Sequence, residues 1–279
     1  MKFPDLYIIG IPIYVLFGTL EWYYVTRKNK QFFAGRDAMI NIALFVSGSL
    51  IGLIIGGTIF FVWRLLYAHR IFDLQYTPYI FVLIFFVEDF VMYCNHRLQH
   101  TIRYLWEMTH VVHHSSEDYN LSTALRNGWM RPFGGLWILW GLLCWIGFPP
   151  ELVVFQTGVS RIYQFFTHTQ QISKLPSWFE FIFVTPSHHR VHHARNEIYI
   201  DKNYGGILII WDRMFGTFQE ELQEVPVEYG ILAEVDTHSI VDVNFRGLRN
   251  IFQDMRRYGI KTLLYPPGWK PDKQKVENT

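Results

Sequence analysis

The stretch HVVHH at residues 110–114 recurs as HRVHH at residues 189–193, and this repeated pattern is the most informative feature of the chain. Ten of the twelve histidines lie between residues 96 and 193. The others in this region are the pair in HRLQH at residues 96–100, a lone His168, and His188. Neutral imidazole is the commonest metal ligand and suits iron, zinc and copper. The pattern therefore predicts metal binding.

Histidines that are close in sequence share one face of a helix. Residues four or seven apart share one face of a helix, so His96 and His100 lie in line with Asp89. Each HxxHH copy also places its histidines on one face, and we expect each copy to present its nitrogens to a common centre. So many imidazoles exceed the roughly four to six ligands of one ion, and two ions are predicted.

Two further residues are interpreted as supports for the ligands. Asp89 could accept a hydrogen bond from a ligand N–H, or it could pair with Arg97 or Arg103. Gln164 precedes His168 by one helical turn and is interpreted as its supporting partner. The histidine clusters hold no cysteine, which excludes iron–sulfur and thiolate zinc sites, while zinc and iron both stay compatible with imidazole.

The composition indicates a membrane protein. Half of the 279 residues are hydrophobic and only 18% are charged, below the usual quarter for soluble domains. The net charge of +1 gives no reason to expect nucleic acid. The first apolar stretch lacks the features of a cleavable signal peptide and is expected to be a retained anchor. Cys94 and Cys144 lie in apolar stretches and are expected to be buried free thiols.

Five apolar stretches are candidates for crossing a bilayer, which takes about 20 residues of helix. The last two could form a hairpin that turns at Pro149 and Pro150 and enters the membrane only partly. We therefore expect four to five membrane helices. The stretches are residues 6–25, 38–63, 76–94, 132–150 and 151–168.

Basic residues predict the orientation of these helices. Arg27, Lys28, Lys30 and Arg36 follow or precede the first two stretches, so the loop between them is expected on the cytoplasmic side. Alternation then places residues 96–131, and everything after the hairpin, on that side as well. His69 and His238 fall elsewhere and are excluded from the site.

Several motifs around the histidines are specific in combination. They are Glu88-Asp89 with Tyr93 before HRLQH, WEMTHVVHHS at 106–115, TPSHHRVHH at 185–193, NYG at 203–205 and WDRMFGT at 211–217. From about Asp89 to Phe218 the chain resembles the fatty acid hydroxylase / sterol desaturase superfamily of membrane di-iron oxygenases. The stretch SSEDYNLSTALR at 115–126 is similar to the alkylglycerol monooxygenase-like branch, whose members tend to carry glutamate where this chain has Thr101.

The resemblance implies an all-α fold, with a membrane helical bundle and a cytoplasmic helical cap that holds two iron ions. It implies use of O2, with electrons from a separate redox protein or a pterin, to hydroxylate or desaturate a lipid C–H bond. His188 is an extra neighbour that ranks below His189. The ligands it implies are His96, His100, His110, His113, His114, His168, His189, His192 and His193.

These observations predict three regions: membrane helices at 1–75, a catalytic region at 76–218, and a cytoplasmic C-terminal segment at 219–279. The expected partners are the bilayer, a membrane lipid and an electron donor, in a bacterial inner membrane or the endoplasmic reticulum. The substrate is left open among sterol, fatty acyl chain and ether lipid. The alternatives are a membrane protein that stores or transports metal, and a haem electron carrier.

Overall fold

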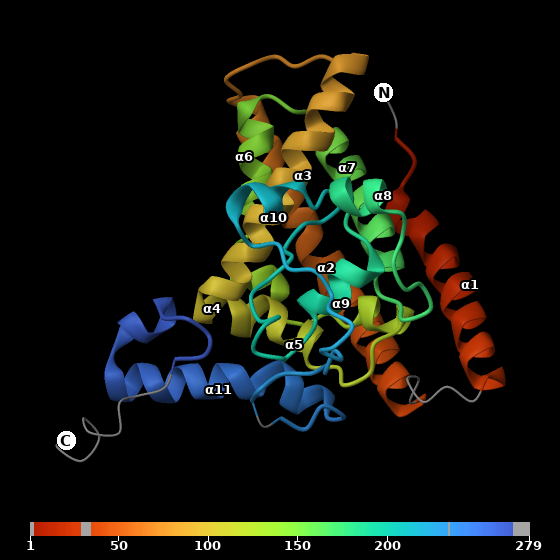
Figure 1. The fold of residues 1–279 in the computed structure, drawn as a ribbon. Helices are drawn as coiled ribbons and strands as arrows, with labels where there is room; N and C mark the ends of the chain where they lie inside the picture. Colours follow the sequence, from red (N-terminus) through yellow and green to blue (C-terminus); the bar gives the residue numbers. More distant parts are fainter. Residues whose placement is uncertain (1–2, 29–34, 234, 270–279) are drawn as a thin grey trace.

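A computed structural model describes residues 3–28, 35–233 and 235–269 of the chain (Figure 1). Within these residues the fold is helical and has no extended strand. Two isolated β-bridges, Phe183 with Leu208 and Ala194 with Tyr229, are the β-pairings found there. The predicted all-α character is confirmed.

Three helices are long and apolar enough to cross a membrane: α1 (Leu6–Arg27), α2 (Gly35–Ala68) and α3 (Pro78–Thr101). Thr77 caps α3, with Pro78 at its first position, where the missing N–H costs nothing. Leu53 and Ile54 on α2 are 78% and 79% exposed, as expected of side chains that face lipid. The chain is an integral membrane protein, and three of the predicted spans coincide with these helices.

The other two predicted spans have a different form. Residues 132–150 are divided between a 3₁₀ turn, η3 (Arg131–Gly134), and a nine-residue helix, α6 (Ile138–Ile146), because Gly135 adopts a left-handed conformation between them. At about 1.5 Å per residue α6 covers less than half of a hydrocarbon core. The predicted turn leads into α7 (Pro150–Thr167). The expected number of four to five spans is therefore not confirmed.

The hairpin of α6 and α7 packs against α2 and α3 through one apolar cluster. Its buried members are Trp63, Ile84, Leu143, Cys144, Phe148, Leu152 and Val153. Cys144 is buried as predicted, whereas Cys94 is half-buried, so the expectation for that thiol was wrong.

The remaining helices lie beside the long ones, several of them toward the end where α3 ends and α2 begins (Figure 1). They hold six of the twelve histidines. In chain order they are α4 (Arg103–Leu105), the π-helix η1 (Trp106–His110), α5 (Val111–His114), η2 (Leu121–Leu125), α8 (Ser177–Ile182), α9 (Pro186–His192), α10 (Ile210–Phe215), α11 (Ile240–Tyr258) and η4 (Ile260–Leu264).

Buried polar side chains tie this end to the spanning helices. Arg126 is fully buried; its guanidinium donates to Asp37 and Asn41 of α2 and to the carbonyl of Val112. Glu21 of α1 accepts from the backbone N–H of Leu121. A buried charge that loses its partner is strongly destabilising. These contacts therefore favour one position of the short helices against the long ones.

Candidate metal centre

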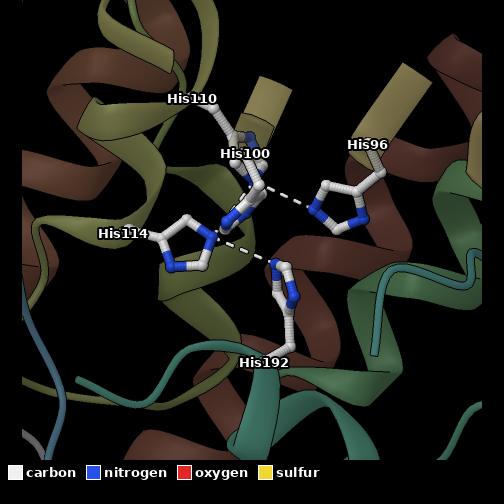
Figure 2. A group of neighbouring side chains, drawn as sticks. All are labelled: His96, His100, His110, His114 and His192. Atoms are coloured by element: carbon white, nitrogen blue, oxygen red, sulfur yellow. Dashed lines mark hydrogen bonds between the residues drawn. The ribbon is translucent and has the colours of Figure 1, made fainter. Parts of the chain in front are cut away.

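Nine histidines converge in two adjacent groups. His96, His100, His110, His114 and His192 form the first group, drawn in Figure 2, and His113, His168, His189 and His193 form the second. Within each group one nitrogen per ring lies within 4.8 Å of the corresponding nitrogen of every other ring. Eight of the nine side chains are buried, and His113 is half-buried.

The two HxxHH copies do not each serve one centre, which corrects the expectation from spacing. The first copy gives His110 and His114 to the first group and His113 to the second. The second copy gives His189 and His193 to the second group and His192 to the first. The reason is helical geometry: residues i and i+4 point about 40° apart, while i+3 lies about 60° to the other side. Each copy therefore straddles both groups.

Two features of the backbone position these histidines: a π-helix that leads into the first HxxHH copy and a capped helix start before the second. His110 ends the π-helix η1, and a π-turn shifts the register of the side chains that follow it. Helix α9 begins with Thr185, whose side chain accepts from the N–H of His188, and with Pro186 at its first position. His188 thus supports the start of α9.

Backbone carbonyls hold the outer nitrogens of several rings. Nδ1 of His96 lies 2.9 Å from the carbonyl of Tyr204, and Nδ1 of His192 lies 2.9 Å from that of Lys202. In the second group, Nδ1 of His113 lies 3.2 Å from the carbonyl of Arg126, and Nδ1 of His168 lies 2.8 Å from that of Gln164. Since a carbonyl can only accept, each of these Nδ1 atoms carries the proton, and each Nε2 keeps a bare lone pair.

The bare nitrogens face one another. Nε2 of His113 and Nε2 of His168 are 3.2 Å apart with no hydrogen available to either. In the first group the bare Nε2 atoms of His96 and His192 lie 2.9 Å from Nε2 of His110 and 3.0 Å from Nε2 of His114, respectively, and these last two atoms are 3.0 Å apart. Opposed lone pairs in a buried site repel, and a cation between them removes the repulsion.

The spacing fits a metal ion. Two imidazoles that bind one ion at right angles, each at about 2.1 Å, have their nitrogens about 3 Å apart. Nε2 of His100 and Nε2 of His193 are buried with no hydrogen-bond partner, as expected of atoms reserved for a ligand bond. The donor set therefore suits two imidazole-bound ions.

The electrostatics keep these rings neutral. Burial, and then the neighbouring imidazoles, hold the pKa of His110, His114, His192 and His193 well below the usual 6.5. Burial lowers the pKa of His168 to about 4. Neutral imidazole is the form that binds metal, so the fold favours the ligand state at physiological pH.

Asp89 has a different role from either of those predicted. Its carboxylate accepts from the N–H groups of Ile207 and Leu208, at 2.8 and 3.1 Å, and from the indole of Trp211 at 2.9 Å. It contacts neither a ligand N–H nor an arginine. Instead it anchors the segment whose Tyr204 carbonyl orients His96. Asp89 therefore acts on the ligands through the backbone.

The rest of that segment is fixed in the same way. Asp212 accepts from the N–H groups of Tyr204 and Gly205, both at 2.8 Å. Asp201 and Asn203 adopt positive φ angles of 60° and 56°. Such angles are uncommon except for Asn, Asp and Gly, and they turn Asp201 Oδ1 to 3.3 Å from Nδ1 of His100. Residues 201–206 form a support loop for the first group.

Gln164 also differs from the prediction. Its main-chain carbonyl, not its side chain, contacts His168, and its side-chain amide donates to Ser160. His188 lies outside both groups, as do the excluded His69 and His238.

Sequence reasoning missed the carbonyls of Lys202, Tyr204 and Arg126, because main-chain atoms have no residue signature. It also missed Asp201. The signal that could have found this support loop is the run Asp201-Lys202-Asn203-Tyr204-Gly205-Gly206, rich in residues that accept positive φ.

Comparison with known proteins agrees with this geometry. Residues 81–217 match the model of the fatty acid hydroxylase family. Alkylglycerol monooxygenase of Homo sapiens is 37% identical over 224 residues, 77% of this chain and 48% of the relative. That of Danio rerio is 42% identical over 199 residues, 70% of this chain and 43% of the relative. An ornithine lipid hydroxylase of Rhizobium tropici is 27% identical over 149 residues, 53% of this chain and 44% of the relative.

The chain spans about half the length of the curated relatives it matches. No solved structure matches it. The fold and the site define a class: helical membrane proteins with two buried groups of imidazoles suited to metal. The chain belongs to the fatty acid hydroxylase family, and its alkylglycerol monooxygenase relatives match the branch indicated by residues 115–126.

His113→Ala tests the division into two groups. We expect metal content to fall from about two ions per chain to about one, because only the second group loses a ligand. Elemental analysis of anaerobically purified protein measures this. His69→Ala, which removes an exposed imidazole, is the matched control and should leave the content unchanged. Unchanged metal content in His113→Ala would contradict the assignment.

Asp89→Asn tests the support loop. The substitution replaces one accepting oxygen with an amide that donates, so an N–H of the 207–211 segment loses its partner and the Tyr204 carbonyl shifts. We expect metal affinity to fall by about 10- to 100-fold, the usual effect of disturbing a ligand's support. Competition with a chelator reports the affinity. Asp73→Asn, at an exposed carboxylate away from the histidines, should bind as the parent chain does.

Acidification should destabilise the metal-free protein. Below about pH 6.5 the unfolded chain binds more protons than the folded chain, because folding lowers the pKa of His168 to about 4 and lowers that of its neighbours. Stability is complete above that pH and is lost as the pH falls toward the folded pKa. Each such histidine lowers the free energy of unfolding by up to about 1.4 kcal/mol per pH unit.

Thermal unfolding of chelator-treated protein should give a lower Tm at about pH 5.5 than at about pH 7.5. An equal or higher Tm at the lower pH would contradict this prediction.

Proposed function

We propose that this chain is a non-haem di-iron monooxygenase that uses O2 to hydroxylate a C–H bond of a membrane lipid. The observation that supports this most strongly is the convergence of nine neutral imidazoles in two groups at the end of three apolar helices. Relatives named for alkylglycerol oxidation and lipid hydroxylation support the same reaction type.

The number of ligands favours iron over zinc. Five imidazoles in the first group exceed the usual four ligands of zinc. When bound, the iron pair would supply the activation of O2 that side chains cannot provide.

The protein would supply ligands, orientation and exclusion of water. Nδ1–H bonds to backbone carbonyls aim the Nε2 atoms inward. Burial of eight ligands keeps bulk water from the reacting centre, while half-buried His113 makes the second group the more open of the two. In the overall reaction one oxygen atom enters the C–H bond and the other becomes water. This takes two electrons and two protons from an external donor, a redox protein or a pterin.

The substrate we favour is an alkyl ether lipid, because relatives that match more than two thirds of this chain are named alkylglycerol monooxygenases. Thr101, where the chain departs from that branch, is exposed, and its hydroxyl bonds to the carbonyl of Arg97 at the end of α3. The departure therefore leaves both groups intact. Sterols and acyl lipids, and desaturation in place of hydroxylation, are the competing outcomes of the test.

The two alternatives fit less well. A haem between two axial imidazoles needs room for a flat macrocycle, yet rings such as His96 and His192 have centroids only 4.3 Å apart with other imidazoles around them. A transporter needs ionisable groups free along its spans. Glu21 and Asp89 instead accept from backbone N–H groups. Glu88 of α3 meets this need only in part: one of its oxygens accepts from the indole of Trp140, while the other is buried with no hydrogen-bond partner among the described residues.

We also propose that the histidine end faces the cytoplasm. Arg27, Lys28 and Arg36 lie at that end of α1 and α2, and such a bias is typical of the cytoplasmic side. Lys30, the fourth basic residue of this loop, lies outside the described residues.

The test is turnover by the purified, iron-loaded protein in lipid vesicles with O2 and a chemical or enzymatic reductant. We expect O2-dependent hydroxylation of an alkyl lipid, with one labelled oxygen atom from ¹⁸O2 in the product. His193→Ala should abolish it, whereas His69→Ala should not. Turnover without any reductant, incorporation of oxygen from water, or an intact metal-loaded protein inactive on all three lipid classes would contradict the proposal.

A further inference from the structure

Helix α11 carries two apolar stripes; the protein buries one of them and leaves the other half-buried to exposed. Val243 and Ile251 are buried together with Asn244. The second stripe follows the spacing i, i+4, i+7, i+11 and i+14, which is one face of a helix. Two of its members, Val241 and Phe252, are 59% and 57% exposed. The stripe comprises Val241, Phe245, Leu248, Phe252 and Met255.

Exposed apolar residues continue beyond the helix. Ile260 and Leu264, at the two ends of η4, are 70% and 71% exposed. The exposed apolar residues of α11 and η4 thus follow one another along the chain, and exposed apolar residues that form one patch mark an interaction surface.

The depth of α11 is inferred from the apolar cluster that it shares with α2. Val243 and partly buried Ile240 pack in one cluster with Leu44 and Ile40 of the spanning helix. These α2 residues lie in the stretch 38–63, which contains no charged residue. Beside them, Ile42 and Val46 are 51% and 53% exposed, as lipid-facing side chains are. Helix α11 therefore lies at a level where α2 has already entered the bilayer.

The exposed stripe faces the deeper side of α11. Phe245, a member of the stripe, lies 5.9 Å from the ring of Trp129, centroid to centroid. The Trp129 indole donates to Ser47 of α2 at 2.8 Å. Ser47 is further along α2, and deeper, than Leu44, which contacts the buried stripe. Figure 1 shows α11 lying across the end of the bundle.

Basic residues flank the stripe. Residues 240–264 hold five basic side chains against two acidic ones, Asp242 and Asp254. Arg246 and Arg249 pair with Asp242. Arg256 and Lys261 are exposed and form no ion pair with the described residues. Apolar side chains beside unpaired cations match the boundary between acyl chains and anionic headgroups.

We infer that α11 is an interfacial helix that lies in the surface of the bilayer on the side of the metal centre. Its Val241–Met255 stripe contacts acyl chains, and Arg256 and Lys261 contact anionic lipid headgroups. The occupant of this surface is lipid, and the inference does not depend on the proposed function. A protein partner on the same face is the outcome that would overturn it.

Depth-dependent quenching tests the position of the helix. Phe252→Cys is labelled with an environment-sensitive fluorophore in the full chain, reconstituted in vesicles of phosphatidylcholine and phosphatidylglycerol. The parent chain, with half-buried Cys94 and buried Cys144, is treated in parallel to give the background. We expect shallow nitroxide-labelled lipid to quench the label several-fold more than aqueous iodide does, with a blue-shifted emission.

Gln253→Cys is the matched control, since Gln253 is also exposed and the next residue points about 100° away. Its label should respond mainly to iodide. Equal lipid quenching at the two positions, or preferential iodide quenching at Phe252→Cys, would overturn the inference. Val241→Cys provides a second position on the stripe, and retention of the parent chain's metal content shows that each variant is folded.

Headgroup preference tests the basic residues. At equal mole fraction, nitroxide-labelled phosphatidylglycerol should quench the Phe252→Cys label more than labelled phosphatidylcholine does. The difference should shrink in a background of Arg256→Gln and Lys261→Gln, and at high salt, because surface electrostatics are screened. Equal quenching by the two headgroups would reject the anionic contact.

Discussion

The hydrogen bond from an imidazole Nδ1–H to a backbone carbonyl is the interaction on which the centre depends. It fixes the tautomer, the ring orientation and the direction of the Nε2 lone pair in one contact. Four histidines use it, and the carbonyls belong to Tyr204, Lys202, Arg126 and Gln164. Because those carbonyls are backbone atoms, their positions depend on the side chains that hold the surrounding backbone in place. The buried carboxylates Asp89 and Asp212 do this for the support loop. The buried guanidinium of Arg126 does it for the C-terminal end of η2, where the Arg126 carbonyl lies.

This arrangement explains why polar residues occur where apolar ones are expected. Glu21, Asp37 and Asp89 lie on spanning helices, yet each accepts hydrogen bonds from the histidine-bearing end of the molecule. A carboxylate in this position would be costly if it were unpartnered. Here it couples a helix held by the bilayer to a loop that orients a ligand. The membrane thus contributes to the rigidity of the centre through three long helices and a few buried charges.

The helical class, three of the spans and the clustered histidines could be predicted from sequence, because long apolar runs and imidazole spacing are local properties. The full set of nine, with the isolated His168, came from the family resemblance. The distribution of HxxHH between two centres could not. Spacing gives the angles between side chains on one helix, but which neighbour a side chain meets depends on a packing partner far away in the chain. The roles of Asp89 and Gln164 were missed for a related reason, since both act through main-chain atoms. The break within residues 132–150 follows from Gly135, whose left-handed conformation outweighs an otherwise continuous apolar run.

Each HxxHH copy supplies histidines to both groups, and this has a consequence for biosynthesis. As the ribosome releases the chain, the donors from α3, α5 and the end of α7 emerge first, and neither group has its full set until α9 has been made. The carbonyls of residues 202 and 204 follow later still. Both pockets are therefore completed in one late event, and an ion captured earlier would be held by a partial shell. Insertion of a metal would in this way be deferred until the chain has folded in the bilayer.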